Sequence, residues 1–212
     1  MNYELMIDTF PKLLMGSYIT IQLVTISLFI GLCLAVGLAI LRLSNNTFLT
    51  FFAKSYVFYF RGTPLLVQIF LIYYGIGQFE VVRESFFWFF FKEAYWCGIL
   101  ALTLNTCAYS SEIIRGGIQS VPLGQIESAK STGMSRFLLY RRIILPIAFR
   151  QALPAYGNEI ILMLKGTSLA STVTLMDLTG VAKYIISTTF KPIEVFIVAG
   201  SIYLFMTFII HN

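Results

Sequence analysis

The sequence predicts an all-α integral membrane protein with five transmembrane helices, and three observations support this fold class. Of its 212 residues, 58% are hydrophobic and only 12% are charged, whereas soluble domains average about 25% charged residues. The mean hydropathy is +0.80. The apolar runs between the charged residues are each close to the roughly 20 residues that a helix needs to cross a bilayer.

One membrane domain, residues 1–212, is expected. Acidic rather than basic residues near the start argue against a cleavable signal peptide. Because the last apolar run reaches Asn212 without a basic residue, we expect a short cytoplasmic tail to follow it. The apolar runs predict spans at about residues 17–41, 55–77, 95–114, 154–176 and 193–210, with a polar loop at 115–150.

Basic residues predict the orientation of these spans, because cytoplasmic loops are enriched in Lys and Arg. Five spans place the two termini on opposite sides, and the loops of one side hold most of the basic residues against a single acid, Glu127. We therefore expect the N-terminus outside the cell and the C-terminus in the cytoplasm. The basic residues of the cytoplasmic side are Arg42, Lys54, Arg115, Lys130, Arg136, Arg141, Arg142 and Arg150.

The loop 115–150 is predicted to contain two short helices joined by a tight turn. Pro122 suits the start of the first helix, and Gly133 can end it in the left-handed conformation. Ser135 can cap the second helix, which Pro146 is expected to end. A basic amphipathic loop of this kind could also lie on anionic lipid headgroups. A small apolar knob is expected from Ile126, Ala129 and Met134.

The same loop resembles the EAA loop of membrane subunits of ABC importers, which reads E-A-A, three residues, G, nine residues, I-x-L-P. One position departs from the pattern, because Ser128 replaces the first alanine; serine is small enough to keep a close approach. The resemblance implies the type I ABC importer fold, in which this segment is a coupling helix that inserts into a cytoplasmic ATPase. The matching positions are Glu127, Ala129, Gly133, Ile143, Leu145 and Pro146.

Outside the loop, the segments 61–79, 105–125 and 153–178 resemble polar amino-acid permeases, most of all those for arginine and for histidine, lysine and arginine. The resemblance implies import of a basic amino acid (arginine, histidine, lysine or ornithine) across a bacterial inner membrane. It also implies several partners: a dimer of ATPase subunits that bind ATP and Mg, a second permease subunit, identical or related, and an extracytoplasmic binding protein.

The chain itself is expected to be a transport subunit and not an enzyme. It has no G-x-x-x-x-G-K-[ST] motif for ATP phosphates. No cofactor or metal site is expected, because the three cysteines lack zinc spacing and His211 is the sole histidine. Its basic residues are dispersed between apolar runs, so no nucleic-acid partner is expected.

Charged residues within the predicted spans need a partner or a water-filled path. Arg61 precedes Gly62, Thr63 and Pro64, a sequence that interrupts a helix; this break could be a packing kink or could line a cavity. Glu112 and Arg115 are spaced to form an ion pair on one helix.

Glu159 is the strongest candidate for contact with the substrate. Its carboxylate could pair with Lys165 or Arg61, or it could bind the side-chain cation of a basic amino acid. The resemblance favours the second role, since relatives similar to glutamine permeases tend to read "NQ" where this chain reads "NE". Donors for the substrate carboxylate could come from Thr63, Asn158, Thr167 and Ser168.

Two other functions remain open. A permease of the same type could carry glutamine or another polar amino acid. A stand-alone secondary transporter would need its own ion coupling and is often built from internal repeats, and none is evident here.

Overall fold

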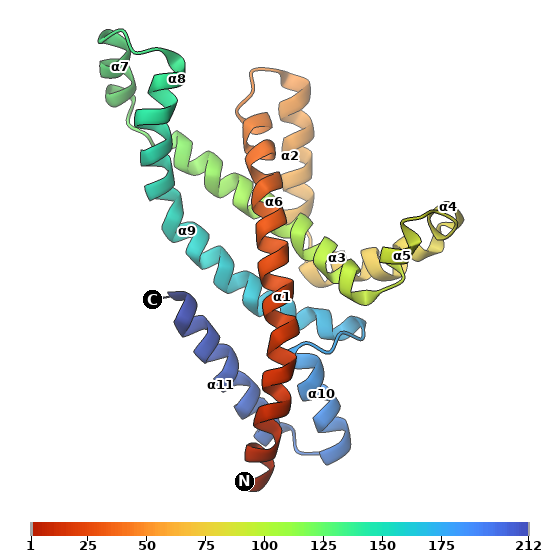
Figure 1. The fold of residues 1–212 in the computed structure, drawn as a ribbon. Coiled ribbons are helices and arrows are strands. Elements are labelled where there is room, and N and C mark those ends of the chain that lie inside the picture. Colours follow the sequence, from red (N-terminus) through yellow and green to blue (C-terminus); the bar gives the residue numbers. More distant parts are fainter. Residues whose placement is uncertain (1, 212) are drawn as a thin grey trace.

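The chain folds into helices arranged around one long N-terminal helix (Figure 1). The computed structural model describes residues 2–211. Helix α1 (Tyr3–Arg42) runs most of the length of the molecule, and α6 (Ala94–Gln119) and α9 (Leu145–Gly166) cross it. These three helices pack on one another and form the centre of the fold.

The remaining long helices occupy opposite ends of α1 (Figure 1). Helix α2 (Thr47–Gly62) returns beside the C-terminal half of α1. Helices α10 (Leu178–Thr189) and α11 (Pro192–His211) pack near its N-terminal half. The short helices α7 (Leu123–Ser131) and α8 (Arg136–Leu139) lie at the same end as the α1–α2 connection, so the strongly basic segments share one end of the molecule.

Three helices are long and apolar enough to cross a membrane: α1, α6 and α11. Two bent helix pairs meet the same criteria together, Thr47–Gly62 with Leu65–Gln78 at 105° and Arg136–Val173 with Leu178–Thr189 at 47°. Residues 2–211 therefore contain three candidate spans, or up to five if each bent pair is one span. The first, third and fifth predicted spans lie within α1, α6 and α11.

The second and fourth predicted spans are not single straight helices. The second changes direction between α2 and α3 (Leu65–Phe70), which continues through a π-helical turn, η1 (Leu71–Gly75), and a short 3-10 helix, η2 (Ile76–Gln78). The fourth passes from α9 into a 3-10 helix, η4 (Thr167–Val173), and ends at Thr174 in the left-handed conformation.

The break in the second span lies where Gly62 and Pro64 interrupt the helix, as predicted. Because Pro64 has no N–H, the carbonyl of Phe60 loses the donor that an α-helix would supply four residues later. The side-chain amide of Gln68 donates to this carbonyl at 2.8 Å, and that of Asn105 donates at 3.3 Å. Two side chains thus replace the missing backbone donor and stabilise the bend.

Gly133 ends α7 as the sequence predicts, with φ +78°. Its N–H donates to the carbonyl of Lys130 at 3.0 Å, and the N–H of Met134 donates to that of Ala129 at 3.2 Å. These two bonds form a Schellman cap, which favours glycine at the left-handed position. Ser135 caps α8 by accepting from the N–H of Leu138 at 3.4 Å.

The predicted helix end at Pro146 is wrong. From Arg136 the helix continues through a π-helical turn, η3 (Tyr140–Ile144), directly into α9, and Leu145 is helical at φ −63° and ψ −43°. The N–H of Leu145 donates to the carbonyl of Tyr140, five residues back. This wider turn gives the proline ring the room that a regular helix denies it. Much of the predicted loop 115–150 is therefore part of α6 and of the helix that enters α9.

Two short helices, α4 (Glu80–Arg83) and α5 (Trp88–Phe91), project sideways from the main body (Figure 1). Phe86 and Phe87, in the turn between them, and Phe89 of α5 are exposed, as expected of aromatic residues at headgroup depth.

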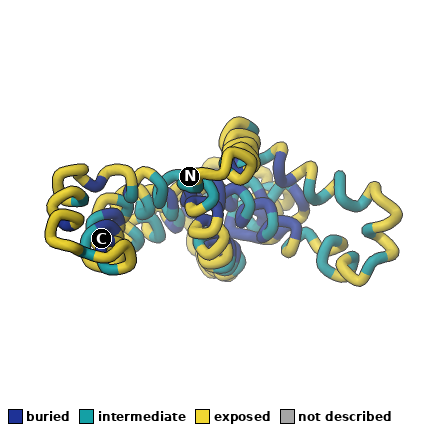
Figure 2. The backbone as a smooth tube through the Cα atoms, turned by 90° about the horizontal axis from the view of Figure 1, so that it is seen from above, coloured by how far each residue is buried: buried dark blue, intermediate teal, exposed yellow. Residues whose placement is uncertain are grey.

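The buried core lies where the long helices cross, and the ends of the molecule are mostly exposed (Figure 2). One cluster joins α1, α6 and α9 with α3 and η4, and a second joins α1 to α10 and α11. Many large apolar side chains outside these clusters are exposed, as expected for a surface that faces lipid or other subunits.

Candidate functional site

A pocket of about 300 Å³ lies between the break after α2 and the facing sides of α6 and α9. Glu159 of α9 lines it and is only 5% exposed. Its Oε1 accepts a hydrogen bond from the hydroxyl of Thr106 at 2.9 Å. The wall also includes the polar side chains of Thr63, Asn105 and Tyr109 among apolar ones, so a buried carboxylate faces a mixed polar and apolar surface.

The break in the second span supplies one wall of this pocket. Gln68 is 2% exposed, and its Nε2 donates to the carbonyl (3.1 Å) and the hydroxyl (2.8 Å) of Thr63. Its Oε1 accepts from Nδ2 of Asn105 at 2.9 Å. The bend is therefore tied to α6 by side-chain amides, and this holds Thr63 beside the pocket.

A close approach between α1 and α6 positions the hydroxyl that Glu159 uses. A Cβ added to Gly31 of α1 would lie 2.3 Å from Cγ2 of Thr106 and 3.2 Å from the carbonyl of Thr103. An added Cβ would force a shift at this crossing, so α1 packs closely against the methyl group of the same side chain whose hydroxyl donates to Glu159.

Neither of the ion pairs considered for Glu159 is present. Among residues 2–211, no basic nitrogen lies within 4.0 Å of its carboxylate. Lys165 is exposed on the next turns of the helix. Arg61 lies instead against the ring of Tyr109, with its guanidinium carbon 5.1 Å from the ring centroid.

The predicted pair between Glu112 and Arg115 is present, and it belongs to a larger cluster. Arg115 Nη2 lies 2.8 Å from Glu112, Arg42 Nη2 lies 2.9 Å from it, and Arg61 Nη1 lies 3.9 Å from it. One carboxylate of α6 thus faces three guanidinium groups from α1, α2 and α6 itself. Arg42 and Arg115 are well paired, whereas Arg61 is not.

A second pocket, of about 620 Å³, opens over this cluster. Its charged lining consists of Arg42, Lys54, Arg61 and Glu112. Tyr109 lines both this pocket and the one around Glu159, so the two adjoin across one aromatic side chain.

The structure brings together only some of the predicted substrate residues. Thr63 and Glu159 share one pocket, and Arg61 lines the adjoining one. Asn158 is exposed and lines neither. The hydroxyls of Thr167 and Ser168 donate to carbonyls three residues back in their own helix, at 2.7 and 2.6 Å, and lie outside both pockets.

Four polar residues of this region were not predicted from the sequence. Each of them is a polar residue within an apolar span, and this feature could have identified them from the sequence. In addition, Asn105, Tyr109 and Glu112 have the helical spacing that places them on one face of α6. The missed residues are Gln68, Asn105, Thr106 and Tyr109.

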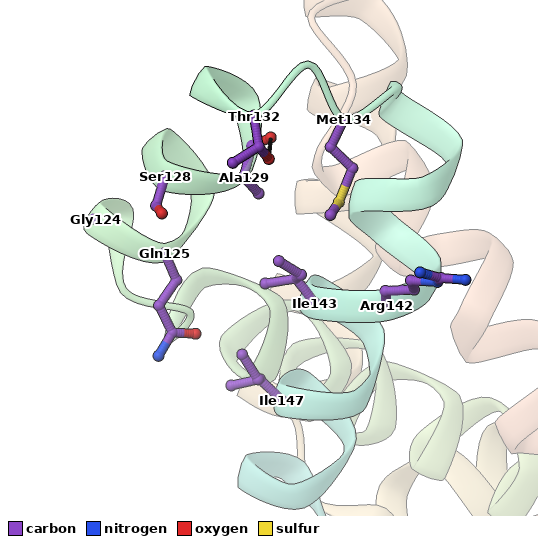
Figure 3. Close-up of a pocket in the computed structure, with 9 residues that line it drawn as sticks. All are labelled: Gly124, Gln125, Ser128, Ala129, Thr132, Met134, Arg142, Ile143 and Ile147. Atoms are coloured by element: carbon purple, nitrogen blue, oxygen red, sulfur yellow. Dashed lines mark hydrogen bonds between the residues drawn. The ribbon is translucent and has the colours of Figure 1, made fainter.

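A third pocket, of about 490 Å³, lies between α7 and the helix that enters α9 (Figure 3). Ala129 and Ile143 line it, and Met134 points toward the same space. The predicted knob of Ile126, Ala129 and Met134 packs inward on Leu139 and Ile144 as a small core. Glu127 and Leu145 are exposed, so they remain available to another protein.

A helical membrane fold with pockets that contain charged side chains, a broken span and a protruding basic helix pair is typical of a membrane transport subunit. The family described as "Binding-protein-dependent transport system inner membrane component" matches residues 15–211, and the chain belongs to this family.

Relatives and solved structures make the class more specific. The chain is 58% identical to the nopaline transport system permease protein NocM of Agrobacterium fabrum, over 99% of this chain and 88% of that protein. It is 56% identical to the octopine permease OccM of Rhizobium meliloti, with 95% and 82% covered. It is 46% identical to the histidine/lysine/arginine/ornithine permease HisM of Escherichia coli K12, with 92% and 82% covered.

Among solved structures, the fold matches a crystal structure of an amino acid ABC transporter with histidines. The TM-score is 0.89 at 36% identity, covering 100% of this chain and 94% of that one. An inward-facing methionine transporter, MetNI, matches at a TM-score of 0.72 with 14% identity, covering 94% of this chain and 91% of that one, and this likeness concerns the fold alone.

The chain is therefore a permease subunit of an ABC importer for amino acids or opines, a multi-pass component of the inner membrane and not an enzyme. The predicted class is confirmed. A binding-protein-dependent system of this kind implies two sorts of partner, an ATPase and a binding protein.

Proposed function

We propose that this permease carries a solute with a cationic side chain, either a basic amino acid or an opine derived from arginine. The names of its relatives support the proposal, since they include permeases for nopaline, octopine and histidine/lysine/arginine/ornithine. Octopine and nopaline are arginine derivatives, so a guanidinium group is common to arginine and both opines. The sequence had suggested basic amino acids, and the relatives add the opines.

The observation that carries this proposal is the buried carboxylate of Glu159. A desolvated carboxylate is costly unless a cation or sufficient hydrogen bonds accompany it. Among residues 2–211 it has no ion-pair partner, and one hydroxyl donates to it. A guanidinium or ammonium group of the solute supplies the missing charge, and a guanidinium can do so through two parallel hydrogen bonds.

The experiment is direct binding of labelled arginine to the assembled permease–ATPase complex without the binding protein. Glu159→Gln removes the charge but keeps the shape of the side chain. We expect arginine affinity to fall about tenfold or more, and affinity for glutamine to stay the same or rise. Glu84→Gln, at an exposed position, is the matched control. Unchanged arginine binding in Glu159→Gln would exclude the proposal and favour a neutral polar amino acid.

We further propose that α7 and the following turn form the coupling helix that docks on the ATPase. The residues concerned are Glu127, Ala129, Gly133, Ile143, Leu145 and Pro146. Exposed Glu127 and Leu145 contact the partner, while Ala129, Gly133 and Ile143 shape the segment from within. Deletion of residues 125–132 should leave membrane insertion intact and uncouple ATP hydrolysis from uptake. Wild-type transport by this deletion would contradict the role.

The complete transporter in this proposal holds a second permease subunit, identical or related, and two ATPase subunits that bind ATP and Mg. The binding protein delivers the solute to the outer side, where the N-terminus also lies, and the C-terminus is cytoplasmic. The grouping of basic residues at the end that carries α7 supports this orientation. A stand-alone secondary transporter is the alternative: ATP-independent uphill transport by the purified chain would establish it.

A further inference from the structure

We infer that Arg61 and Lys54 form a second solute subsite, which binds the carboxylate of the same molecule whose cationic group faces Glu159. The inference rests on the proposed function and deepens it, because it predicts recognition of both ends of the solute. Its basis is the pair of adjoining pockets that share Tyr109.

The charges of the larger pocket are not balanced within the chain. Its lining carries three cationic groups, from Arg42, Lys54 and Arg61, against the one carboxylate of Glu112. Glu112 is already engaged at 2.9 Å by Arg42 and at 2.8 Å by Arg115. An additional anion is therefore favoured in this pocket.

Two of the cations have donors to spare. Arg61 reaches Glu112 only at 3.9 Å and is 45% exposed, and no hydrogen bond from its guanidinium is found within residues 2–211. Lys54 is exposed and forms no ion pair in the described part of the chain. A carboxylate between them would gain charge-assisted hydrogen bonds without displacing an existing ion pair.

The arrangement matches a dipolar solute. Arg61 lies against the ring of the shared Tyr109 and lines the larger pocket, and Glu159 lines the smaller one. The two volumes, about 620 and 300 Å³, fall in the range of small-molecule sites. A molecule with a guanidinium at one end and a carboxylate at the other would find an acidic partner in the smaller pocket and basic partners in the larger one. An opine adds a further carboxylate, which gives Lys54 a partner of its own.

The test compares three ligands that share a guanidinium group: arginine, octopine, and agmatine, which is arginine without its carboxylate. Binding of each is measured on the intact permease–ATPase complex without the binding protein. We expect Arg61→Gln to lower the affinity for arginine and for octopine about tenfold. The affinity for agmatine should stay the same or rise, because the substitution removes the Arg61 cation that repels its amine. Lys54→Gln should weaken octopine more than arginine.

Controls separate this inference from the proposed function. Arg83→Gln removes a similarly exposed arginine, 50% exposed, outside both pockets and should change none of the three affinities. Glu159→Gln should weaken all three ligands, agmatine included. If it does so while Arg61→Gln leaves arginine unaffected, the cation site stands and the carboxylate subsite is overturned.

An anionic lipid headgroup is the competing occupant of this pocket. Mass spectrometry of complexes purified from phosphatidylglycerol bilayers would detect retained lipid. Loss of that lipid in Arg61→Gln with unchanged arginine affinity would assign the pocket to lipid and overturn the inference. Equal weakening of arginine and agmatine by Arg61→Gln would also overturn it, since a carboxylate contact cannot affect agmatine.

Discussion

The carboxylate of Glu112 lies 2.9 Å from the guanidinium of Arg42, and this contact ties the middle of the fold to the end of its longest helix. Both side chains are largely buried, at 14% and 13% exposed. Arg115 and Arg61 approach the same carboxylate from two other directions. Glu112 therefore keeps three guanidinium groups close together at the wall of the larger pocket.

Replacing Glu112 with glutamine should destabilise the permease. The substitution leaves Arg42 and Arg115 partly buried without a counter-charge, and breaking such a pair costs about 2–3 kcal/mol at this degree of exposure. The thermal unfolding midpoint of the assembled complex should fall by several degrees. Glu84→Gln is the exposed control. An unchanged midpoint would mean that the cluster contributes nothing to stability.

The hydrogen bond from the Gln68 amide to the carbonyl of Phe60 should be required because Pro64 removes the backbone donor. Gln68→Leu leaves the carbonyl of Phe60 with the longer bond from Asn105 alone and should cost about 1–3 kcal/mol. Adding Pro64→Ala restores an N–H four residues after Phe60, so the double variant should regain part of the lost thermal stability. The measurement is the unfolding midpoint of both variants and of Pro64→Ala alone. Additive losses would refute this account of the bend.

Close packing at Gly31 should control the hydrogen bond that Thr106 gives to Glu159. In Gly31→Ala the new methyl group would lie 2.3 Å from Cγ2 of Thr106, so the threonine must rotate or α1 must move. Arginine affinity of the complex should fall several-fold. Thr106→Ser removes Cγ2 and keeps the hydroxyl, so it should restore binding in the double variant.

Gly37 provides the matched control for that prediction, because it lies on the same helix and an added Cβ meets nothing within 4 Å. Gly37→Ala should bind arginine normally and, if anything, stabilise the helix by about 0.5–1 kcal/mol. Failure of Thr106→Ser to rescue Gly31→Ala would show that the backbone contact with Thr103, at 3.2 Å, dominates instead.

Local sequence rules predicted the features that depend on single residues. The helix break at Gly62 and Pro64, the left-handed Gly133 and the cap at Ser135 each follow from backbone chemistry that one residue determines. Pro146 shows the limit of such rules. A π-helical turn before it changes the hydrogen-bond register, and no residue in that turn predicts this change.

The candidate site was predictable only in part, because it is assembled from helices distant in sequence. Glu159 stood out as an acid in an apolar span. Thr167 and Ser168 were equally plausible as donors to the solute, but in the structure their hydroxyls donate to backbone carbonyls three residues back. Whether such a hydroxyl bonds to the backbone or faces a pocket depends on local geometry that the sequence does not show. Tyr109 separates two pockets because of the direction that the chain takes after α2, and the sequence pattern does not predict that direction.

The left-handed Gly133 should be important for coupling rather than for solute binding. Gly133→Ala places a Cβ at φ +78°, a conformation that costs about 1–2 kcal/mol for an L-residue, and so weakens the Schellman cap that ends α7. The pockets lined by Arg61 and Glu159 do not include Gly133, so arginine affinity should be unchanged, whereas ATP-driven uptake in proteoliposomes should fall relative to ATP hydrolysis. Gly124→Ala, within α7 and with nothing near an added Cβ, serves as the control. A parallel loss of uptake and hydrolysis in Gly133→Ala would point to misfolding, and a normal ratio of the two would exclude a coupling role for this turn.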